Sequence, residues 1–279
     1  IQYPDSGTKY GVIENNAVTG PDTATNTIDA ARELCSDTLV ITGTIPLGHS
    51  EVRQQTSVEY PERYATQIFQ NALREKGIKV LDRENVRKQF GKPEMRTLAS
   101  GPPLSRIILA MNKTSDNFYA ECLFRTVAKV VGGEGSWTRG IQIMRKYLAS
   151  IGIDTLELQF TDGSGLSRMD LVTADAIVKL LRVMSLDPKL DSAFYNSLPI
   201  MGVDGTLENR LKNTPAMGNI HAKTGSMTGV RAVSGYLTTR DGEPIAFSIL
   251  ANNYTVSGSE IGKLEDEVLL KLVNFSRAR

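Results

Sequence analysis

The spacing of apolar positions divides the chain into a β-like beginning, a helical middle and a β-rich end. Before Pro61, short β-branched runs bounded by turn-forming residues predict strands at residues 10–14 and 38–45. After Pro61 apolar residues recur every three or four positions, which is typical of amphipathic helices. The helices predicted on this basis cover residues 62–76, 104–111, 118–131, 137–151 and 173–184, and shorter apolar runs predict strands at residues 78–81 and 96–100.

The last third of the chain has a different pattern. Strands are predicted at residues 221–224, 230–238 and 245–252, and the Asp241-Gly242 pair between the last two is a strong hairpin signal. One apolar stripe runs along residues 261–275 and predicts a helix that packs on this sheet. Helices followed by antiparallel strands and a covering helix predict an α+β fold. The change of pattern near Pro61 places a domain boundary between residues 1–55 and 56–279.

Composition excludes several classes of protein. The 279 residues include 32 Lys and Arg against 31 Asp and Glu, so the net charge of +1 gives no general attraction for nucleic acid. No apolar run approaches the length of a membrane-spanning helix, so no membrane span is expected. Cys35 and Cys122, and His49 and His221, lack the spacing of a metal site. We expect the cysteines to be buried free thiols, although a single disulfide bond stays open.

Two short motifs carry candidate chemistry. Ser115-Asp116-Asn117 lies between two predicted helices, and Lys223-Thr224-Gly225 with Ser226 lies on a predicted strand. Both tripeptides accompany an S-x-x-K nucleophile in penicillin-binding proteins and serine β-lactamases. A serine between helices can relay a proton, the Asn amide can hold a substrate amide, and a Lys can attract a carboxylate. A strand edge without a side chain at Gly225 lets a substrate backbone lie alongside and offers an N–H to an oxyanion.

Each motif also has a purely structural interpretation. The first could be only a helix cap, and the second only an exposed strand edge. The turn-rich stretch 162–168 is interpreted as structural, with glycines at positive φ. His221 is interpreted as a packing residue of its strand, and Trp137 as a core residue.

Longer stretches resemble one family closely. Residues 112–121, 162–168, 203–207 and 221–230, with Ser234-Gly-Tyr236, resemble the D-alanyl-D-alanine carboxypeptidase/endopeptidase group of class C low-molecular-mass penicillin-binding proteins, the S13 serine peptidases. The resemblance implies that residues 1–55 end a small β-rich inserted domain. It implies that residues 56–279 form the C-terminal part of a penicillin-binding-protein or β-lactamase-like transpeptidase domain.

The resemblance also implies roles for individual residues and a function. Ser115, Asn117 and Lys223 would be catalytic, Thr224, Gly225 and Ser226 would bind substrate, and the Ser226 N–H would complete the oxyanion hole. The activity implied is cleavage of D-Ala-D-Ala peptidoglycan stem peptides, or of cross-links between them, through an acyl-enzyme that β-lactams also form. No metal or organic cofactor is implied, and the expected location is periplasmic or extracellular.

The family's nucleophile lies in an S-x-x-K motif at the start of a helix, far upstream of the Ser-Asp-Asn motif. The one match in this chain, Ser6-Gly7-Thr8-Lys9, has glycines that disfavour a helix. We therefore expect the nucleophile on an N-terminal half outside this chain, which would be a partner of the site. Such an absence predicts an exposed apolar face of the sheet where the nucleophile-bearing helices belong, unless a partner chain covers it. Two alternatives stay open: a non-catalytic peptidoglycan-binding or scaffold module, and a β-lactamase-like hydrolase that uses Ser6.

Overall fold

The computed structural model describes residues 11–33, 35–54, 56–79 and 100–277. The chain forms two compact units, residues 1–97 and residues 98–279. These units divide the chain later than the change of pattern near Pro61, and the domain boundary at residues 55–56 stays a prediction. The strands predicted at residues 78–81 and 96–100 fall largely outside the described residues, and Ser6 and Lys9 lie wholly outside them.

The first unit contains short strands and one helix. Strand β4 (Thr38–Thr42) pairs in parallel with β1 (Val12–Asn15) and antiparallel with β3 (Asp29–Arg32), while β2 (Val18–Gly20) and β5 (Thr44–Pro46) form a separate parallel pair. The helix predicted at 62–76 is confirmed as α1 (Pro61–Glu75), with proline in its first turn.

A single glycine splits the strand predicted at residues 38–45. Gly43 separates β4 from β5, has a φ of +101°, and leaves no room for a Cβ beside the Thr27 carbonyl. The prediction of one continuous strand was therefore wrong at this point, because the left-handed backbone at Gly43 interrupts the pairing.

The second unit confirms the remaining predicted helices to within a few residues. They are α3 (Leu104–Thr114), α4 (Asn117–Gly132), α5 (Trp137–Ser150), α6 (Ala174–Leu186) and α8 (Gly258–Val273). Thr173 caps α6 as its sequence position predicts, because its Oγ1 accepts a hydrogen bond from the Ala176 N–H. Two short helices were not predicted, α7 (Asp191–Ser197) and the 3₁₀ turn η1 (Gly205–Leu207).

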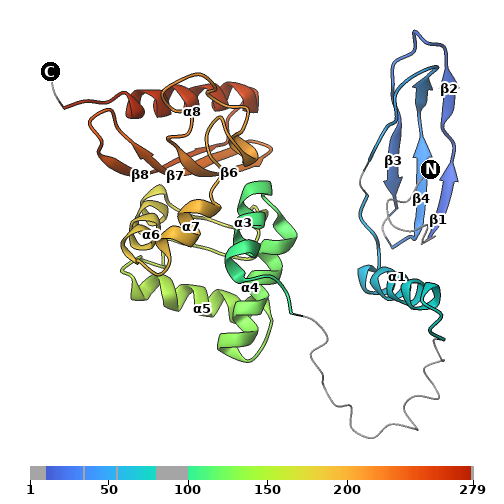
Figure 1. Cartoon of the computed structure of the whole chain (residues 1–279), viewed down its shortest axis with the longest axis horizontal. Helices are drawn as coiled ribbons and strands as arrows, with labels where there is room; N and C mark the ends of the chain where they lie inside the picture. Colours follow the sequence, from blue (N-terminus) through green and yellow to red (C-terminus); the bar gives the residue numbers. More distant parts are fainter. Residues whose placement is uncertain (1–10, 34, 55, 80–99, 278–279) are drawn as a thin grey trace, which may run out of the picture. The chain divides into compact units, whose positions relative to one another are not determined.

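The sheet of this unit is built from three consecutive antiparallel strands. They are β6 (His221–Met227), β7 (Val230–Thr238) and β8 (Pro244–Asn252), in that order. Helix α8 covers one face of the sheet, and the other helices lie on the opposite side (Figure 1). The buried core joins the sheet to α8, and it includes Met201, Leu207, Ile220, Val233, Leu237 and Leu269. The α+β layout is confirmed.

Several apolar side chains of α4 are exposed, although the apolar spacing predicted the helix correctly. Phe118, Val130 and Val131 are 73%, 78% and 67% exposed. Trp137 is about half exposed and is not a core residue, so that prediction was wrong. Cys122 also lies on the surface of α4, and Cys35 is exposed in the first unit. Both cysteines are free as expected, but their predicted burial was wrong.

Candidate active site

Ser115 occupies a sharp corner between two helices. Its φ of 57° and ψ of 50° end α3 in the left-handed conformation, and the Asp116 N–H closes that end by donating to the Met111 carbonyl. Asp116 is the cap of α4, since its Oδ1 accepts a hydrogen bond from the Tyr119 N–H at 2.9 Å. Asn117 is the first residue of α4 and is exposed. The capping role thus falls to Asp116 and leaves the Ser115 hydroxyl for another contact.

That contact is with Lys223, which lies 108 residues away in the sequence. The Lys223 Nζ donates to Ser115 Oγ at 2.6 Å and to the Thr224 carbonyl oxygen at 2.6 Å. Burial lowers the pKa of Lys223. The fold therefore brings the two predicted motifs together, and it joins a serine hydroxyl to an amine whose proton is easier to remove than that of an exposed lysine.

The remaining predicted residues line the same edge of the sheet. Gly225 and Ser226 are exposed on β6, the first strand of the sheet, where they pair with Ala232 and Arg231 of β7. A Cβ added at Gly225 would lie 3.6 Å from the Ala232 side chain, so packing within the described residues does not require glycine there. Among the described residues, no hydrogen bond joins Asn117 or Ser226 to the Lys223–Ser115 pair.

An ion pair behind the site was not predicted from the sequence. Lys113, two residues before Ser115, is mostly buried and its Nζ donates to both carboxylate oxygens of Asp204 at 2.7 Å. The same ammonium donates to the Leu198 carbonyl at 2.6 Å, and Asp204 also accepts from the Ile200 N–H at 2.8 Å. The segment 198–204 is thereby fixed against the end of α3. Lys113 and Asp204 are 91 residues apart, so no local pattern could indicate the pair.

The same segment also contacts the Lys223-Thr224-Gly225 motif. Thr206 in η1 shares a hydrogen bond of 2.8 Å with Thr224, oxygen to oxygen. The Ala222 N–H of β6 donates to the Pro199 carbonyl, which holds the strand against the segment. The segment 198–207 consequently lies between the corner at Ser115 and the strand that carries Lys223.

His221 packs beside this site on the same strand. Its ring stacks on Tyr195 of α7 with centroids 4.1 Å apart and planes 20° from parallel. Burial lowers the pKa of His221, which favours its neutral form near pH 7. The stacking agrees with the interpretation of His221 as a packing residue.

Glu121 of α4 organises the turn at residues 162–168. Its Oε1 accepts from the backbone N–H groups of Gly163 and Ser164 at 3.0 and 3.1 Å, and its Oε2 accepts from Trp137 Nε1 at 2.9 Å. Burial raises the pKa of Glu121, but the hydrogen bonds from Trp137, Gly163 and Ser164 outweigh burial and the pKa is lowered. A carboxylate that stays ionised is thus the anchor of this turn.

The two glycines of the turn are required for different structural reasons. Gly165 has a φ of +75°, as the sequence interpretation expected, and its N–H donates to Asp162. Gly163 does not lie in the left-handed region, so the expectation was wrong there, and a Cβ at Gly163 would collide with the Phe124 side chain. At the end of the turn Arg168 donates to the Thr228 carbonyl at 2.9 Å, next to β6.

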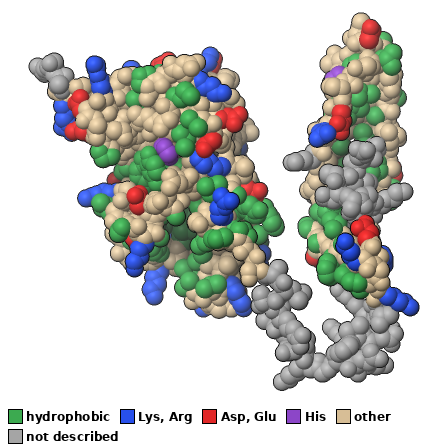
Figure 2. All heavy atoms as spheres, viewed as in Figure 1, with side chains coloured by type: hydrophobic (Ala, Val, Ile, Leu, Met, Phe, Trp, Pro, Cys, Tyr) green, Lys and Arg blue, Asp and Glu red, His purple; other side chains and the backbone are tan. Residues whose placement is uncertain are grey.

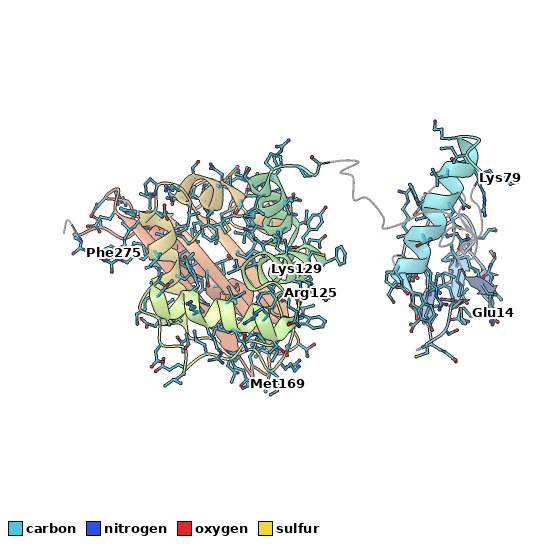
Figure 3. All side chains as sticks on the ribbon, turned by 90° about the horizontal axis from the view of Figure 1, so that it is seen from below. Glu14, Lys79, Arg125, Lys129, Met169 and Phe275 are labelled. Atoms are coloured by element: carbon cyan, nitrogen blue, oxygen red, sulfur yellow. The ribbon has the colours of Figure 1, made fainter. Side chains whose placement is uncertain are left out.

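A largely apolar groove of about 740 Å³ lies between α4 and α5. Hydrophobic side chains of this unit gather over the region of α3 and α4 in Figure 2. Arg125 and Lys129 lie in the C-terminal half of α4 (Figure 3). Arg125 donates to the Gly135 carbonyl, and Lys129 donates to the Gly133 carbonyl. The residues that line the groove include Met111, Leu123, Phe124, Val127, Ile143 and Tyr147.

The described residues also limit other kinds of site. Among them no helix is both long and apolar enough to cross a membrane. No group of three or more His, Cys, Asp or Glu side chains in the described ranges is placed to hold a metal ion.

Comparisons with known proteins place these features in a family. A family model described as "D-Ala-D-Ala carboxypeptidase 3 (S13) family" matches residues 2–271. The chain is 34% identical over 275 residues to a D-alanyl-D-alanine carboxypeptidase of Actinomadura sp. (strain R39), covering 96% of this chain and 50% of that protein. It is 32% identical over 226 residues to the D-alanyl-D-alanine carboxypeptidase DacB of Haemophilus influenzae, covering 79% of this chain and 46% of that protein.

A solved structure is similar over almost the whole chain. Penicillin-binding protein 4 (dacB) of Haemophilus influenzae, in complex with a novel β-lactam, superposes with a TM-score of 0.75 at 26% identity, covering 95% of this chain and 64% of that one. The chain spans about half the length of the relatives that it matches. The family resemblance and the penicillin-binding-protein fold expected from the sequence are both confirmed.

Proposed function

The chain belongs to the D-Ala-D-Ala carboxypeptidase 3 (S13) family, and from this membership we propose that it forms part of a penicillin-binding serine peptidase that cleaves D-Ala-D-Ala stem peptides of peptidoglycan. The observation that carries the proposal is the hydrogen bond of 2.6 Å between Lys223 Nζ and Ser115 Oγ. It joins two motifs that are far apart in the sequence into one proton-relay pair. Peptidoglycan lies outside the cytoplasmic membrane, so the proposed location is periplasmic or extracellular.

The proposed reaction uses a nucleophilic serine on another segment of the protein. That serine attacks the carbonyl carbon of the penultimate D-Ala while the lysine of its S-x-x-K motif takes the hydroxyl proton, and the C–N bond to the terminal D-Ala breaks. Ser115 passes a proton to the departing amine, and the proton lost by the attacking hydroxyl returns to Ser115 by way of Lys223. Water then hydrolyses the acyl-enzyme. A β-lactam would acylate the same serine by opening its ring amide.

The substrate would lie along the exposed edge of β6. Lys223 and the Thr224 hydroxyl would bind the terminal carboxylate, and Asn117 would hold the substrate amide. The Ser226 N–H would donate to the oxyanion, and the absence of a side chain at Gly225 lets the substrate backbone approach the strand. The exposure of Gly225 and Ser226 supports this arrangement.

The exposed face of α4 supports a nucleophile outside the described residues. Phe118, Val130 and Val131 are more than two-thirds exposed, and the apolar groove between α4 and α5 begins at Met111, near Ser115. We take the groove, whose lining is largely apolar, as a surface for contact with more protein. We infer that the segment carrying the S-x-x-K motif packs against this face, since the relatives are about twice as long as the chain.

Intact-mass spectrometry after incubation with penicillin G tests the proposal. We expect no adduct on this chain alone, and one penicilloyl group per molecule when the chain is extended by any upstream polypeptide, encoded by its gene, that carries an S-x-x-K motif. A Ser6→Ala variant of the extended protein is the matched control and should label fully. An adduct on Ser6 would favour the β-lactamase-like alternative, and no adduct on either protein would favour a non-catalytic module.

A further inference from the structure

We propose that Thr206 is a positioning residue for substrate binding: it directs the hydroxyl proton of Thr224 toward the carboxylate of the substrate. The inference rests on the proposed function, in which Thr224 binds that carboxylate. The residue that supports the inference, Thr206, belongs to neither of the two motifs. The two threonine hydroxyl oxygens lie 2.8 Å apart.

The direction of this hydrogen bond follows from the chemistry of the groups. A hydroxyl has one proton to donate and two lone pairs that accept. A carboxylate can only accept, so Thr224 must donate its single proton to bind one. The proton between the two threonines must then come from Thr206. If Thr224 donated to Thr206 instead, only its lone pairs would face the carboxylate, and the contact would be repulsive.

Thr206 is fixed in place by the residues on either side of it. Asp204 is held by the ammonium of Lys113 and by the Ile200 N–H. Leu207 is fully buried, and its carbonyl accepts from the Gly202 N–H. A threonine between two such anchors keeps its hydroxyl oriented without further ordering when substrate binds.

The backbone next to Thr206 shows how closely this turn approaches the corner at Ser115. Gly205 has a φ of +61°, and a Cβ there would lie 2.8 Å from the Lys113 carbonyl oxygen. Lys113 is two residues from Ser115, and Thr206 contacts Thr224, which follows Lys223. One turn therefore links the proton-relay pair to the carboxylate-binding hydroxyl.

Exposure of Thr206 makes its role separable from the stability of the fold. Its side chain is exposed, so the hydrogen bond to Thr224 contributes little to folding, and a valine of nearly the same shape should be accepted. Loss of one such hydrogen bond that orients a binding group corresponds to about a threefold to tenfold change in rate.

The experiment uses the protein that carries the nucleophile together with this chain, and it compares penicillin G with its methyl ester, which lacks the carboxylate. For Thr206→Val we expect the second-order acylation rate with penicillin G to fall about threefold to tenfold. The rate with the methyl ester should change less than about twofold, because the charge-assisted hydrogen bond is already absent. Thr206→Ser keeps the hydroxyl and should restore the rate with penicillin G.

Other outcomes overturn the inference in distinguishable ways. An unchanged rate with penicillin G in Thr206→Val, or equal losses with acid and ester, would exclude a role in carboxylate binding while the proposed function stands. Failure of Thr206→Ser to restore the rate would also count against it. A wild-type protein that neither ligand acylates would remove the proposed function and this inference together. Thermal unfolding of each variant provides the control for folding.

Discussion

The buried carboxylate of Glu265 allows a sharp prediction about stability. Glu265 is on α8 and only 2% exposed, yet it lies 3.1 Å from Arg210 Nη2 and 3.6 Å from Arg231 Nε. Arg210 also pairs with Asp266 at 2.6 Å. Because Arg231 is on β7, the carboxylate connects the covering helix to the sheet. Replacing it by alanine would leave two partly buried guanidinium groups facing each other.

The magnitude follows from burial rather than from distance. Removing one partner of a buried ion pair costs about 3–5 kcal/mol. Arg210 keeps Asp266 as a partner, so we expect the lower end, about 3 kcal/mol, for Glu265→Ala. One kcal/mol shifts the Tm of a unit of this size by about 2–4 °C, so the expected decrease is about 6–12 °C.

A matched control is provided by a closer but exposed pair. Glu243 and Arg277 lie 2.8 Å apart, with side chains 39% and 75% exposed. Exposed pairs contribute less than about 1 kcal/mol, so Glu243→Ala should lower Tm by no more than about 4 °C. The assay is thermal unfolding followed by circular dichroism. Equal decreases in the two variants, or a larger one for Glu243→Ala, would refute the argument from burial.

Three further predictions follow from other parts of the second unit. Burial lowers the pKa of Lys223 in the folded chain below its ordinary 10.5. Between the folded and unfolded pKa values the unfolded chain binds more protons, so the free energy of unfolding should rise with pH in that window. Urea midpoints measured from neutral pH to about pH 10 should show this rise, and Lys223→Met should remove it. Glu121→Ala removes the acceptor of Trp137, the single tryptophan of the chain, so its fluorescence should change, and an unaltered emission spectrum would contradict the proposed anchoring of the turn. Gly235→Ala should destabilise the chain by about 3 kcal/mol, because a Cβ would collide with the backbone of β6, whereas Gly225→Ala has room and should change stability within about 0.5 kcal/mol in the same urea titration.

The sequence predicted the elements whose causes are local. Apolar spacing and end signals, such as Thr173 at the start of α6, decide where a helix begins, and the structure confirms them. Burial could not be predicted in the same way. The apolar spacing along α4 predicts the helix but not which of its side chains are buried. Phe118 and Val130 are exposed, because burial depends on which other segments pack against the helix. Cys122 and Trp137 were misjudged for the same reason.

The candidate site was predictable only as far as its motifs. Ser115 and Lys223 belong to short motifs that are recognisable in the sequence, and the fold joins the two residues by a hydrogen bond. The residues that hold these motifs in position come from remote parts of the chain. Lys113 and Asp204 form a partly buried pair over 91 residues, and such pairs leave no periodic signal in a single sequence. The catalytic and binding roles of the motif residues stay predictions.

The left-handed backbone at Ser115 sets stability against the proposed activity. A residue with a Cβ at a φ of 57° costs the folded chain roughly 1–2 kcal/mol, which glycine avoids and asparagine reduces. A library of variants selected only for heat resistance should therefore enrich glycine or asparagine at position 115. Those variants would lose the hydroxyl that Lys223 contacts, so the most heat-resistant clones would be those with the relay pair broken.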